Sequence, residues 1–240
     1  FAADNITMLL TSYNALWGYN TQSGKITKLY EHLGVLKGEW VDFDSTTVDG
    51  KGILWLAYPT KGLIGLSLDT FNQEYFYHQA NSIIDNNVYG LMTDEQGDIW
   101  FSTHNGVFLL NADTHHIRQF SAENGLVATE FNSRAFAQLG KEFIYGSMQG
   151  VSLFDPIALK QVSNEINRLA MAISSTLNDS QHTGLDLNSL QGNNLFTDIN
   201  TTQLQQGRVL APVSNAGSLQ AQVSISDVSL LPADTFKIRF

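Results

Sequence analysis

The chain has 240 residues, which is enough for one large β-domain or for one domain followed by a tail. Its 13 Lys and Arg residues stand against 23 Asp and Glu, so the formal net charge is −10 at pH 7. This acidic balance argues against nucleic acid and against anionic membrane surfaces as partners, because both attract basic surfaces. Cysteine is absent, which excludes disulfides and thiolate chemistry and leaves both the cytoplasm and the periplasm open.

The start of the chain and its hydropathy give no sign of a targeting or membrane segment. No run of apolar residues approaches the roughly 18 that a membrane-spanning helix needs. Residue 1 is Phe and no signal peptide is recognisable, so we expect a processed protein or a piece of a longer one. Only 15% of the residues are charged and 19 are glycine, which favours short strands joined by tight turns.

A repeat of about 44 residues runs through the first two thirds of the chain. Its most similar parts lie at residues 53–70, 98–114 and 142–156, and an earlier, incomplete copy lies at residues 14–29. A residue that recurs in every unit indicates packing, because a catalytic residue is needed only once. The recurring residues are Gly62, Gly106 and Gly150, at intervals of 44, and Trp55, Trp100 and Tyr145, at intervals of 45.

Each repeat predicts four short strands. In the third copy the turn Asp94–Gly97 separates the first two strands, and Asn105-Gly106 between apolar runs predicts a hairpin between the second and the third. Four antiparallel strands in about 44 residues are typical of one blade of a β-propeller. The sequence therefore predicts an all-β fold, a partial β-propeller of about three to four four-stranded blades, within residues 1–156. The strands of the third copy are expected at 88–92, around Trp100, at 107–111 and at 117–120.

The repeats resemble those of the two-component regulator propellers. Those repeats follow the pattern D-x-x-G-x-(I/L)-W-x-(G/S)-T-x-x-G-(L/V), and residues 94–107 fit it closely. Residues 49–55 fit its first half, and Gly150-Val-Ser-Leu-Phe154-Asp-Pro156 is similar to the end of the last repeat in such propellers. In that family a tyrosine-rich β-sandwich-like module follows, and residues 222–231 resemble its first strand.

The resemblance implies an extracytoplasmic sensor module that belongs to a bacterial inner-membrane receptor and faces the periplasm. The output domain of such a receptor is a histidine kinase, often of the hybrid type, or a diguanylate cyclase, and neither is present in this chain. Two departures stand out. Three and a half blades are too few to close a normal ring, which needs roughly four to eight. Residues 157–221 fit nothing in the family pattern.

The last third of the chain predicts little regular structure. Residues 157–221 are expected to be a linker or a poorly ordered, low-complexity segment, with a partner-binding segment as the alternative reading of its later part. Within it one helix is predicted at residues 164–177, with Asn164 as its N-cap. Residues 222–240 alternate in the manner of strands, at 222–231 and 235–240. The helix would present one apolar face, made of Ile166, Leu169, Ala170, Ile173 and Leu177.

No catalytic, metal or cofactor motif is recognisable. His115 and His116 are adjacent and would point to opposite faces of a strand, which argues against a shared metal. A calcium loop counted from Asp44 would need a Glu at its twelfth position, where Trp55 stands. The candidate binding residues are polar and not repeated, and exposed loop residues without any role fit the same pattern. They are His104, Asn105, Asn132 and Arg134.

Three functions compete at this point. The first is a non-catalytic sensory module that binds a small ligand, with oligosaccharides among the candidates, and that works with the rest of its parent receptor. The second is an enzyme on a propeller scaffold, either a lyase or a glycan hydrolase, which would need a non-repeated cluster of His, Glu and Arg. The third is a structural element that docks through open blade edges, which would also allow a homodimer.

Overall fold

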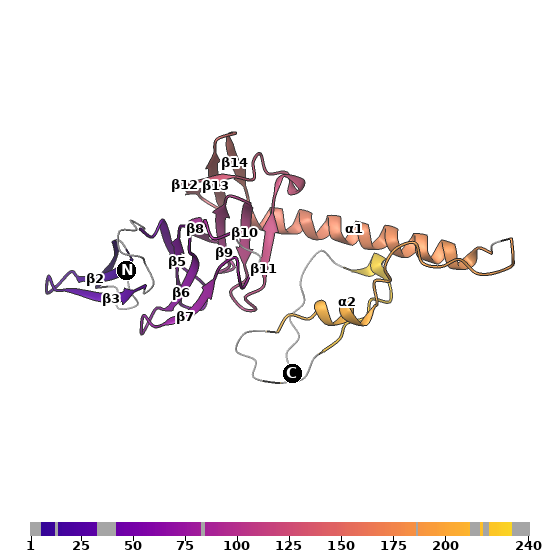
Figure 1. Ribbon diagram of the computed structural model, residues 1–240, viewed down its shortest axis with the longest axis horizontal. Coiled ribbons are helices and arrows are strands. Elements are labelled where there is room, and N and C mark those ends of the chain that lie inside the picture. Colours follow the sequence, from indigo (N-terminus) through magenta and orange to yellow (C-terminus); the bar gives the residue numbers. More distant parts are fainter. Residues whose placement is uncertain are drawn as a thin grey trace. The chain divides into compact units, whose positions relative to one another are not determined.

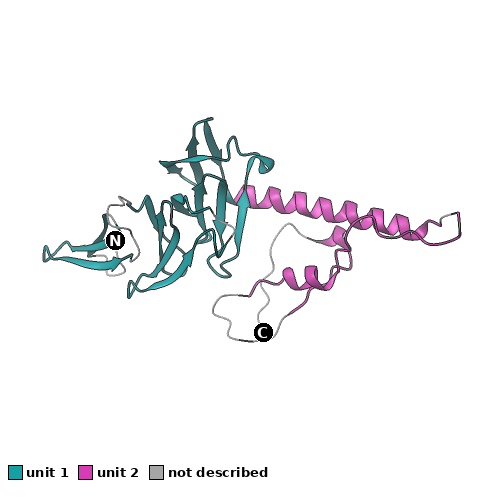
Figure 2. Cartoon of the chain, in the orientation of Figure 1, with its two compact units in different colours: residues 1–156 teal, residues 157–240 magenta. Residues whose placement is uncertain are grey.

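The computed structural model describes residues 6–12, 14–32, 42–82, 85–185, 187–211, 217 and 221–231 (Figure 1). The chain divides into two compact units, residues 1–156 and residues 157–240 (Figure 2). No helix in the described ranges is long and apolar enough to cross a membrane.

The first unit consists of four antiparallel sheets, each built from strands that follow one another in the sequence. This confirms the predicted all-β fold of partial propeller blades, and the described residues of the first and last blades form three strands instead of four. Blade 1 contains β1 (Thr7–Ser12), β2 (Ala15–Asn20) and β3 (Ile26–Glu31); blade 2 contains β4 (Ser45–Val48), β5 (Ile53–Tyr58), β6 (Gly62–Ser67) and β7 (Gln73–Tyr77); blade 3 contains β8 (Tyr89–Thr93), β9 (Ile99–Thr103), β10 (Gly106–Leu110) and β11 (Ile117–Phe120); and blade 4 contains β12 (Phe131–Leu139), β13 (Glu142–Ser147) and β14 (Val151–Phe154).

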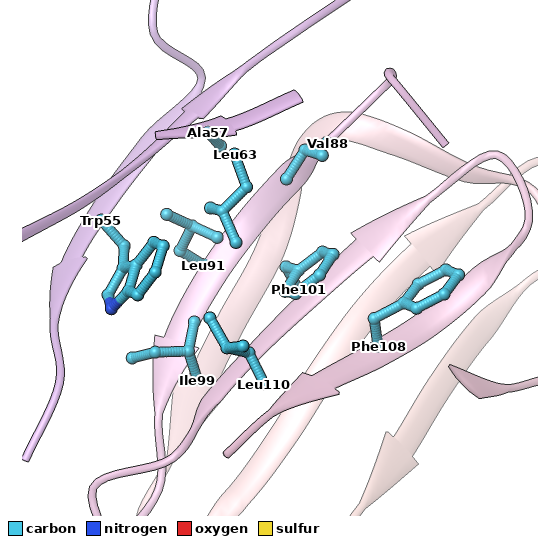
Figure 3. Packing of buried hydrophobic residues seen from close by; sticks show 9 residues of the cluster. All are labelled: Trp55, Ala57, Leu63, Val88, Leu91, Ile99, Phe101, Phe108 and Leu110. Atoms are coloured by element: carbon cyan, nitrogen blue, oxygen red, sulfur yellow. The ribbon is translucent and has the colours of Figure 1, made fainter. Parts of the chain in front are cut away.

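The hydrophobic core lies between the blades. Alternate residues of a strand point to opposite faces of a sheet, so each middle strand supplies apolar side chains to two neighbouring blades. Trp55 and Leu63 of blade 2 pack against Phe101 of blade 3 in one cluster (Figure 3). Leu16 of blade 1 packs against Leu56 of blade 2 in a second cluster. Burying each such side chain contributes about 1.5–3 kcal/mol, so stacking of the blades is the main source of stability.

The first strands of blades 2, 3 and 4, which we call the inner strands, lie side by side, since β4 contacts β8 and β8 contacts β12. Hydroxyl groups connect β4 to β8. The Oγ1 atoms of Thr47 and Thr93 are 2.6 Å apart, and the Leu91 N–H donates to Ser45 Oγ at 2.9 Å. These bonds satisfy polar groups where neighbouring blades meet at their inner strands.

The recurring tryptophans are fixed by an aspartate at the turn before them. Asp94 accepts hydrogen bonds from Trp100 Nε1 at 2.9 Å and from the backbone N–H of Asp98 at 3.1 Å. Asp49 does the same for Trp55 at 2.8 Å. The repeated D-x-x-G-x-x-W pattern is therefore a packing device, in which a buried carboxylate holds both the turn and the indole ring.

Blade 4 departs from the expected repeat at Tyr145. In blade 3 Trp100 pairs with Leu109, and the corresponding pair in blade 4 is Ile144 with Leu153. Tyr145 pairs with Ser152, so it lies on the opposite face of its sheet, toward blade 3. The equivalence of Tyr145 with the tryptophans was wrong, because a shift of one residue in a strand reverses the face.

In the second unit the helix α1 (Pro156–Thr183) is longer at both ends than the predicted 164–177. Pro156 suits the first turn of a helix, and no Gly or Pro interrupts the chain before Gly184. Asn164 therefore lies inside the helix and is not its N-cap. The remaining elements of this unit are α2 (Thr202–Gly207) and η2 (Val228–Leu230), and η1 (Ala122–Asn124) belongs to the first unit.

The residues after α1 are held by asparagine side chains. Asn178 is buried and accepts hydrogen bonds from the backbone N–H of Leu195 and Phe196 at 2.9 and 3.0 Å, so this part of the expected linker is ordered. The structure shows no strand at 222–231. The backbone of Ile225 there bonds to the Asn200 side chain, which takes the place of a partner strand. The strand expected at 235–240 lies outside the described residues.

Candidate ligand-binding site

Polar side chains from blades 2, 3 and 4 gather at one end of the inner strands. They come from the segment before β4, the start of β8, the turn between β9 and β10, and the start of β12. Because these four places differ from blade to blade, they are the part of the repeat that can carry a specific function. We call this set the inner-strand cluster; it consists of Asp44, Tyr89, His104, Glu130, Ser133 and Arg134.

Asp44 connects the three blades. Its Oδ2 atom accepts hydrogen bonds from the backbone N–H of Gly90 at 3.2 Å and of Arg134 at 3.4 Å. Its Oδ1 atom accepts a hydrogen bond from the Ser133 hydroxyl. One carboxylate from blade 2 thus binds the starts of the inner strands of blades 3 and 4. A charged acceptor with several donors is rigidly placed, so it can orient the side chains around it.

Tyr89 and His104 form an aromatic pair beside this carboxylate. The Tyr89 hydroxyl and His104 Nε2 are 3.0 Å apart and share a hydrogen bond, and the ring centroids are 5.4 Å apart. Burial raises the pKa of Tyr89, and the negative charges of Asp44, Asp85 and Glu130 raise it further. The phenol therefore stays protonated at neutral pH, while the imidazole of His104 is exposed.

Arg134 has an unusual backbone conformation. Its φ angle is 58°, in the left-handed region that non-glycine residues seldom adopt. It lies in the irregular part of β12, where the register with β13 shifts between Phe131 and Phe136. Bulges of this kind re-aim a side chain, and strained backbone often accompanies a functional site. Among the described residues no carboxylate forms an ion pair with the exposed Arg134 guanidinium.

The structure brings two of the four predicted residues into the cluster, His104 and Arg134. Asn132 is half-buried at the start of β12, next to Ser133. Asn105 is exposed in the turn between β9 and β10, and its carbonyl oxygen accepts a hydrogen bond from Gln119 Nε2 at 2.6 Å. The backbone of Asn105 is therefore bonded to β11.

Four members of the cluster were missed from the sequence: Asp44, Tyr89, Glu130 and Ser133. A comparison of the positions where each inner strand begins would have singled out Asp44, just before β4, and Tyr89, the first residue of β8. They stand about one repeat apart and differ in chemistry, whereas Thr47 and Thr93 in the same strands match. Ser133 could not be found in this way, because the bulge in β12 breaks the register.

The other polar groups that the sequence singled out lie apart from the cluster. His115 shares a hydrogen bond with the Tyr77 hydroxyl at 3.0 Å, while His116 is exposed. Asp49 is at the opposite end of its blade, bonded to Trp55. Across the described ranges no group of three His, Cys, Asp or Glu side chains could hold a metal ion.

The cluster offers both hydrogen-bond donors and acceptors. Besides the anchored carboxylate of Asp44, the cluster has exposed groups of three kinds, the Glu130 carboxylate, the Arg134 guanidinium and the His104 imidazole. The Tyr89 ring, which is only 8% exposed, packs beneath the His104 ring. Such a mixture fits a ligand that carries several hydroxyl groups, and it does not resemble the basic surface that a polyanion needs.

Residues 79–196 match the family model described as the flagellar hook-associated protein FlgK helical domain. The match covers slightly less than half of the chain. Its helical description agrees with the structure in α1, whereas the part of the match between residues 89 and 154 is built from strands.

The chain is also similar to "Histidine kinase P4" from Formosa agariphila, with 27% identity over 79 residues, which are 32% of this chain and 6% of that protein. Among solved structures it is similar to the extracellular domains of BT4673 and BT3049 from B. thetaiotaomicron, both described as hybrid two component systems. For BT4673 the TM-score is 0.48 at 20% identity, with 63% of this chain and 20% of that chain covered. For BT3049 the TM-score is 0.44 at 18% identity, with 61% and 21% covered.

The chain thus spans about a fifth of the length of these solved chains and a far smaller part of the curated relative. The four stacked blades are evident from the sheets themselves, whose strands pair in sequence order. In its repeats, the chain resembles the two-component regulator propellers.

Proposed function

We propose that the chain is the ligand-sensing propeller part of a bacterial signal-transduction receptor and that the inner-strand cluster binds the ligand. The observation that carries the proposal is the placement of non-repeated polar side chains on a repeated scaffold. Asp44 links three blades at one point, and the strained residue Arg134 lies beside it. Propellers and other repeat folds bind where their loops differ between otherwise similar units.

The ligand that fits this chemistry is small and rich in hydroxyl groups, such as an oligosaccharide. Sugar hydroxyls both donate and accept hydrogen bonds, which matches the Glu130 carboxylate and the Arg134 guanidinium. The faces of sugar rings pack on aromatic side chains, and the exposed His104 ring, which rests on the buried Tyr89 ring, provides such a surface. The acidic chain, with a net charge of −10, disfavours a polyanionic ligand.

In this proposal the chain itself is not catalytic, and the signal passes to an output domain elsewhere in the parent receptor. The resemblance of the repeats to two-component regulator propellers and the similarity to a histidine kinase support this role. They also support a place outside the cytoplasm, in the periplasm, for the blades.

The test is isothermal titration calorimetry of the chain against a panel of neutral and acidic oligosaccharides, with each mixture analysed by mass spectrometry for turnover. We expect at least one oligosaccharide to bind without being consumed. We expect His104→Ala and Arg134→Ala to weaken that binding about tenfold or more, which corresponds to loss of about 1.4 kcal/mol. The exposed His116 provides the control, since His116→Ala leaves the affinity unchanged.

Two outcomes would oppose the proposal. Consumption of the bound oligosaccharide would identify an enzyme on a propeller scaffold. Equal affinities for the wild type and for both site variants would place the ligand elsewhere on the chain.

A second candidate function is favoured by α1. Its apolar stripe is 40–61% exposed, as expected for a helix that packs against others in an assembly, and the family match to a helical domain includes it. This alternative expects a self-assembled chain in light scattering that Leu169→Glu dissociates. The stripe consists of Val162, Ile166, Leu169, Ile173 and Leu177.

A further inference from the structure

Two of the inner strands have a bulge near their start. In β8 the register with β9 shifts between Tyr89 and Met92, and in β12 the register with β13 shifts between Phe131 and Phe136. A residue inside a bulge is left out of the strand ladder, so its N–H group is free to bond elsewhere. The two bulges can therefore turn backbone donors toward a third group.

The donors of both bulges converge on one carboxylate, that of Asp44. The N–H groups of Gly90 in β8 and Arg134 in β12 donate to the same oxygen, Oδ2, at 3.2 and 3.4 Å, and the Ser133 hydroxyl donates to Oδ1. Gly90 and Arg134 have φ angles of 45° and 58°, so both have left-handed backbone. Backbone that turns through this region aims N–H groups at a common point and forms concave anion sites. We call these three donor groups the bulge cradle.

The cradle is held in place by contacts between β8 and β12. The two strands contact each other directly, and a Cβ atom added at Gly90 would stand 2.9 Å from Phe136 Cδ1. Asp44 comes from another blade, because its own N–H donates to the carbonyl oxygen of Ala57 in β5 at 2.9 Å while its side chain crosses to the cradle. We therefore expect the donors to keep their positions when the Asp44 side chain is removed.

The surroundings of the cradle suit one negative charge better than several. Burial, and after it the charges of three carboxylates, raise the pKa of Tyr89, so these carboxylates act on one small region; they are Asp44, Asp85 and Glu130. A second anion placed beside Asp44 would be repelled by them. A carboxylate that takes the place of the Asp44 side chain leaves the local charge unchanged.

We propose that the bulge cradle is a binding site for a single carboxylate group and that Asp44 is its built-in occupant, tethered to blade 2. The tether makes the interaction intramolecular, so the side chain is present at an effective concentration that dilute carboxylates in solution do not match. Asp44 thus joins the blades and at the same time keeps the site closed. A free carboxylate of the right size enters once this side chain is shortened. The inference does not depend on the proposed oligosaccharide.

The test removes the carboxylate from the chain and supplies it again in solution. Asp44→Ala leaves out a group of the size of formate. Thermal unfolding is followed by tryptophan fluorescence, which reports on the first unit because all four tryptophans lie within residues 1–156. We expect Asp44→Ala to lower the melting temperature by about 5 °C or more, and about 0.1 M sodium formate to restore about half of that loss relative to the same concentration of sodium chloride.

The controls are measured in the same two salts. The wild type and Asp44→Asn should melt at the same temperature in both, because a side chain of full size fills the cradle. Asp69→Ala removes an exposed turn carboxylate outside the cradle and should not respond to formate either. Adding Ser133→Ala to Asp44→Ala should weaken the effect of formate, since it deletes one donor of the cradle. If Asp44→Ala does not fold in chloride, refolding from urea in formate should restore the native fluorescence.

Three results would overturn the inference. The first is an Asp44→Ala variant that melts at the same temperature in formate and in chloride, or that stays unfolded in both. The second is an equal response of the wild type or of Asp69→Ala, which would indicate a general salt effect. The third is an undiminished response of the double variant, which would place the anion outside the cradle. Failure of every oligosaccharide to bind would leave all of these expectations unchanged.

Discussion

At the scale of single residues, the buried aspartates that recur at the blade turns stabilise the fold through their hydrogen bonds. Asp94, which is 7% exposed, accepts hydrogen bonds from the N–H groups of Trp100, Gln96 and Asp98. Hydrogen bonds to a charged group are worth about 1.5–3 kcal/mol, and a buried donor left without an acceptor costs about 1–3 kcal/mol.

We therefore expect Asp94→Ala to lower the free energy of unfolding by about 3 kcal/mol in urea denaturation. Asp69 is an exposed turn residue, so Asp69→Ala should change that free energy by less than about 0.5 kcal/mol. Similar losses for both variants would show that the carboxylate does not hold the tryptophan.

A half-buried histidine makes stability depend on pH. Burial lowers the pKa of His115 below its usual value of 6.5, although the charges of Asp49 and Glu74 act in the opposite direction. Burial also raises the pKa of its partner Tyr77 to about 12, so the hydroxyl stays protonated and can donate to the neutral imidazole. Folding therefore favours the uncharged form of His115.

Because the unfolded chain takes up this proton at higher pH than the folded chain does, stability is complete above pH 6.5 and falls as the pH drops toward the folded pKa. We expect the free energy of unfolding to decrease between about pH 7.5 and pH 5.5. His115→Gln should reduce that decrease, and His32, whose pKa is also lowered by burial, should account for part of the remainder. An unchanged pH profile in the variant would contradict this account.

At the scale of elements, the hairpin glycines have a steric role. Gly106 has a φ angle of 106°, and a Cβ atom there would collide with the carbonyl oxygen of Phe120 in the neighbouring strand. Gly24 also has a positive φ angle, 71°, but lies in open space. A substitution at Gly24 therefore introduces backbone strain alone, whereas one at Gly106 introduces both strain and a steric collision.

We expect Gly24→Ala to lower the free energy of unfolding by about 1–2 kcal/mol, because an alanine there must adopt the left-handed conformation. Gly106→Ala should cost a further 1–3 kcal/mol or so, because the strand β11 must move. Thermal and chemical denaturation of the two variants give the comparison. If they lost equal stability, the close approach of β10 and β11 would not matter.

The blades could be predicted from the sequence because their signals are local. Asn105-Gly106 and the turn Asp94–Gly97 determine hairpins within a few residues, and the repeat shows each signal more than once. The face occupied by Tyr145 could not be predicted, since it depends on pairing with β14 and a shift of one residue reverses it. The order after α1 was missed for a related reason, because Asn178 and Asn200 bond to backbone 17–25 residues away.

At the scale of the whole molecule, the candidate site forms because the blades stack and bring distant residues together. Asp44 and Ser133 are 89 residues apart and meet because blades 2, 3 and 4 place their inner strands side by side. His104 and Arg134 could be selected from the sequence as polar and not repeated. That they would share one cluster with Asp44 and Tyr89 required the order of the blades and the bulge in β12.

The position of the ligand is the central functional claim, and hydrogen exchange followed by mass spectrometry measures it directly. The chain is compared with and without the oligosaccharide selected by calorimetry. We expect greater protection in peptides that cover residues 85–92, 102–106 and 130–135, the end of the blades that carries the inner-strand cluster. Protection confined to the turns at residues 49–52 and 94–97, at the other end, would contradict the account.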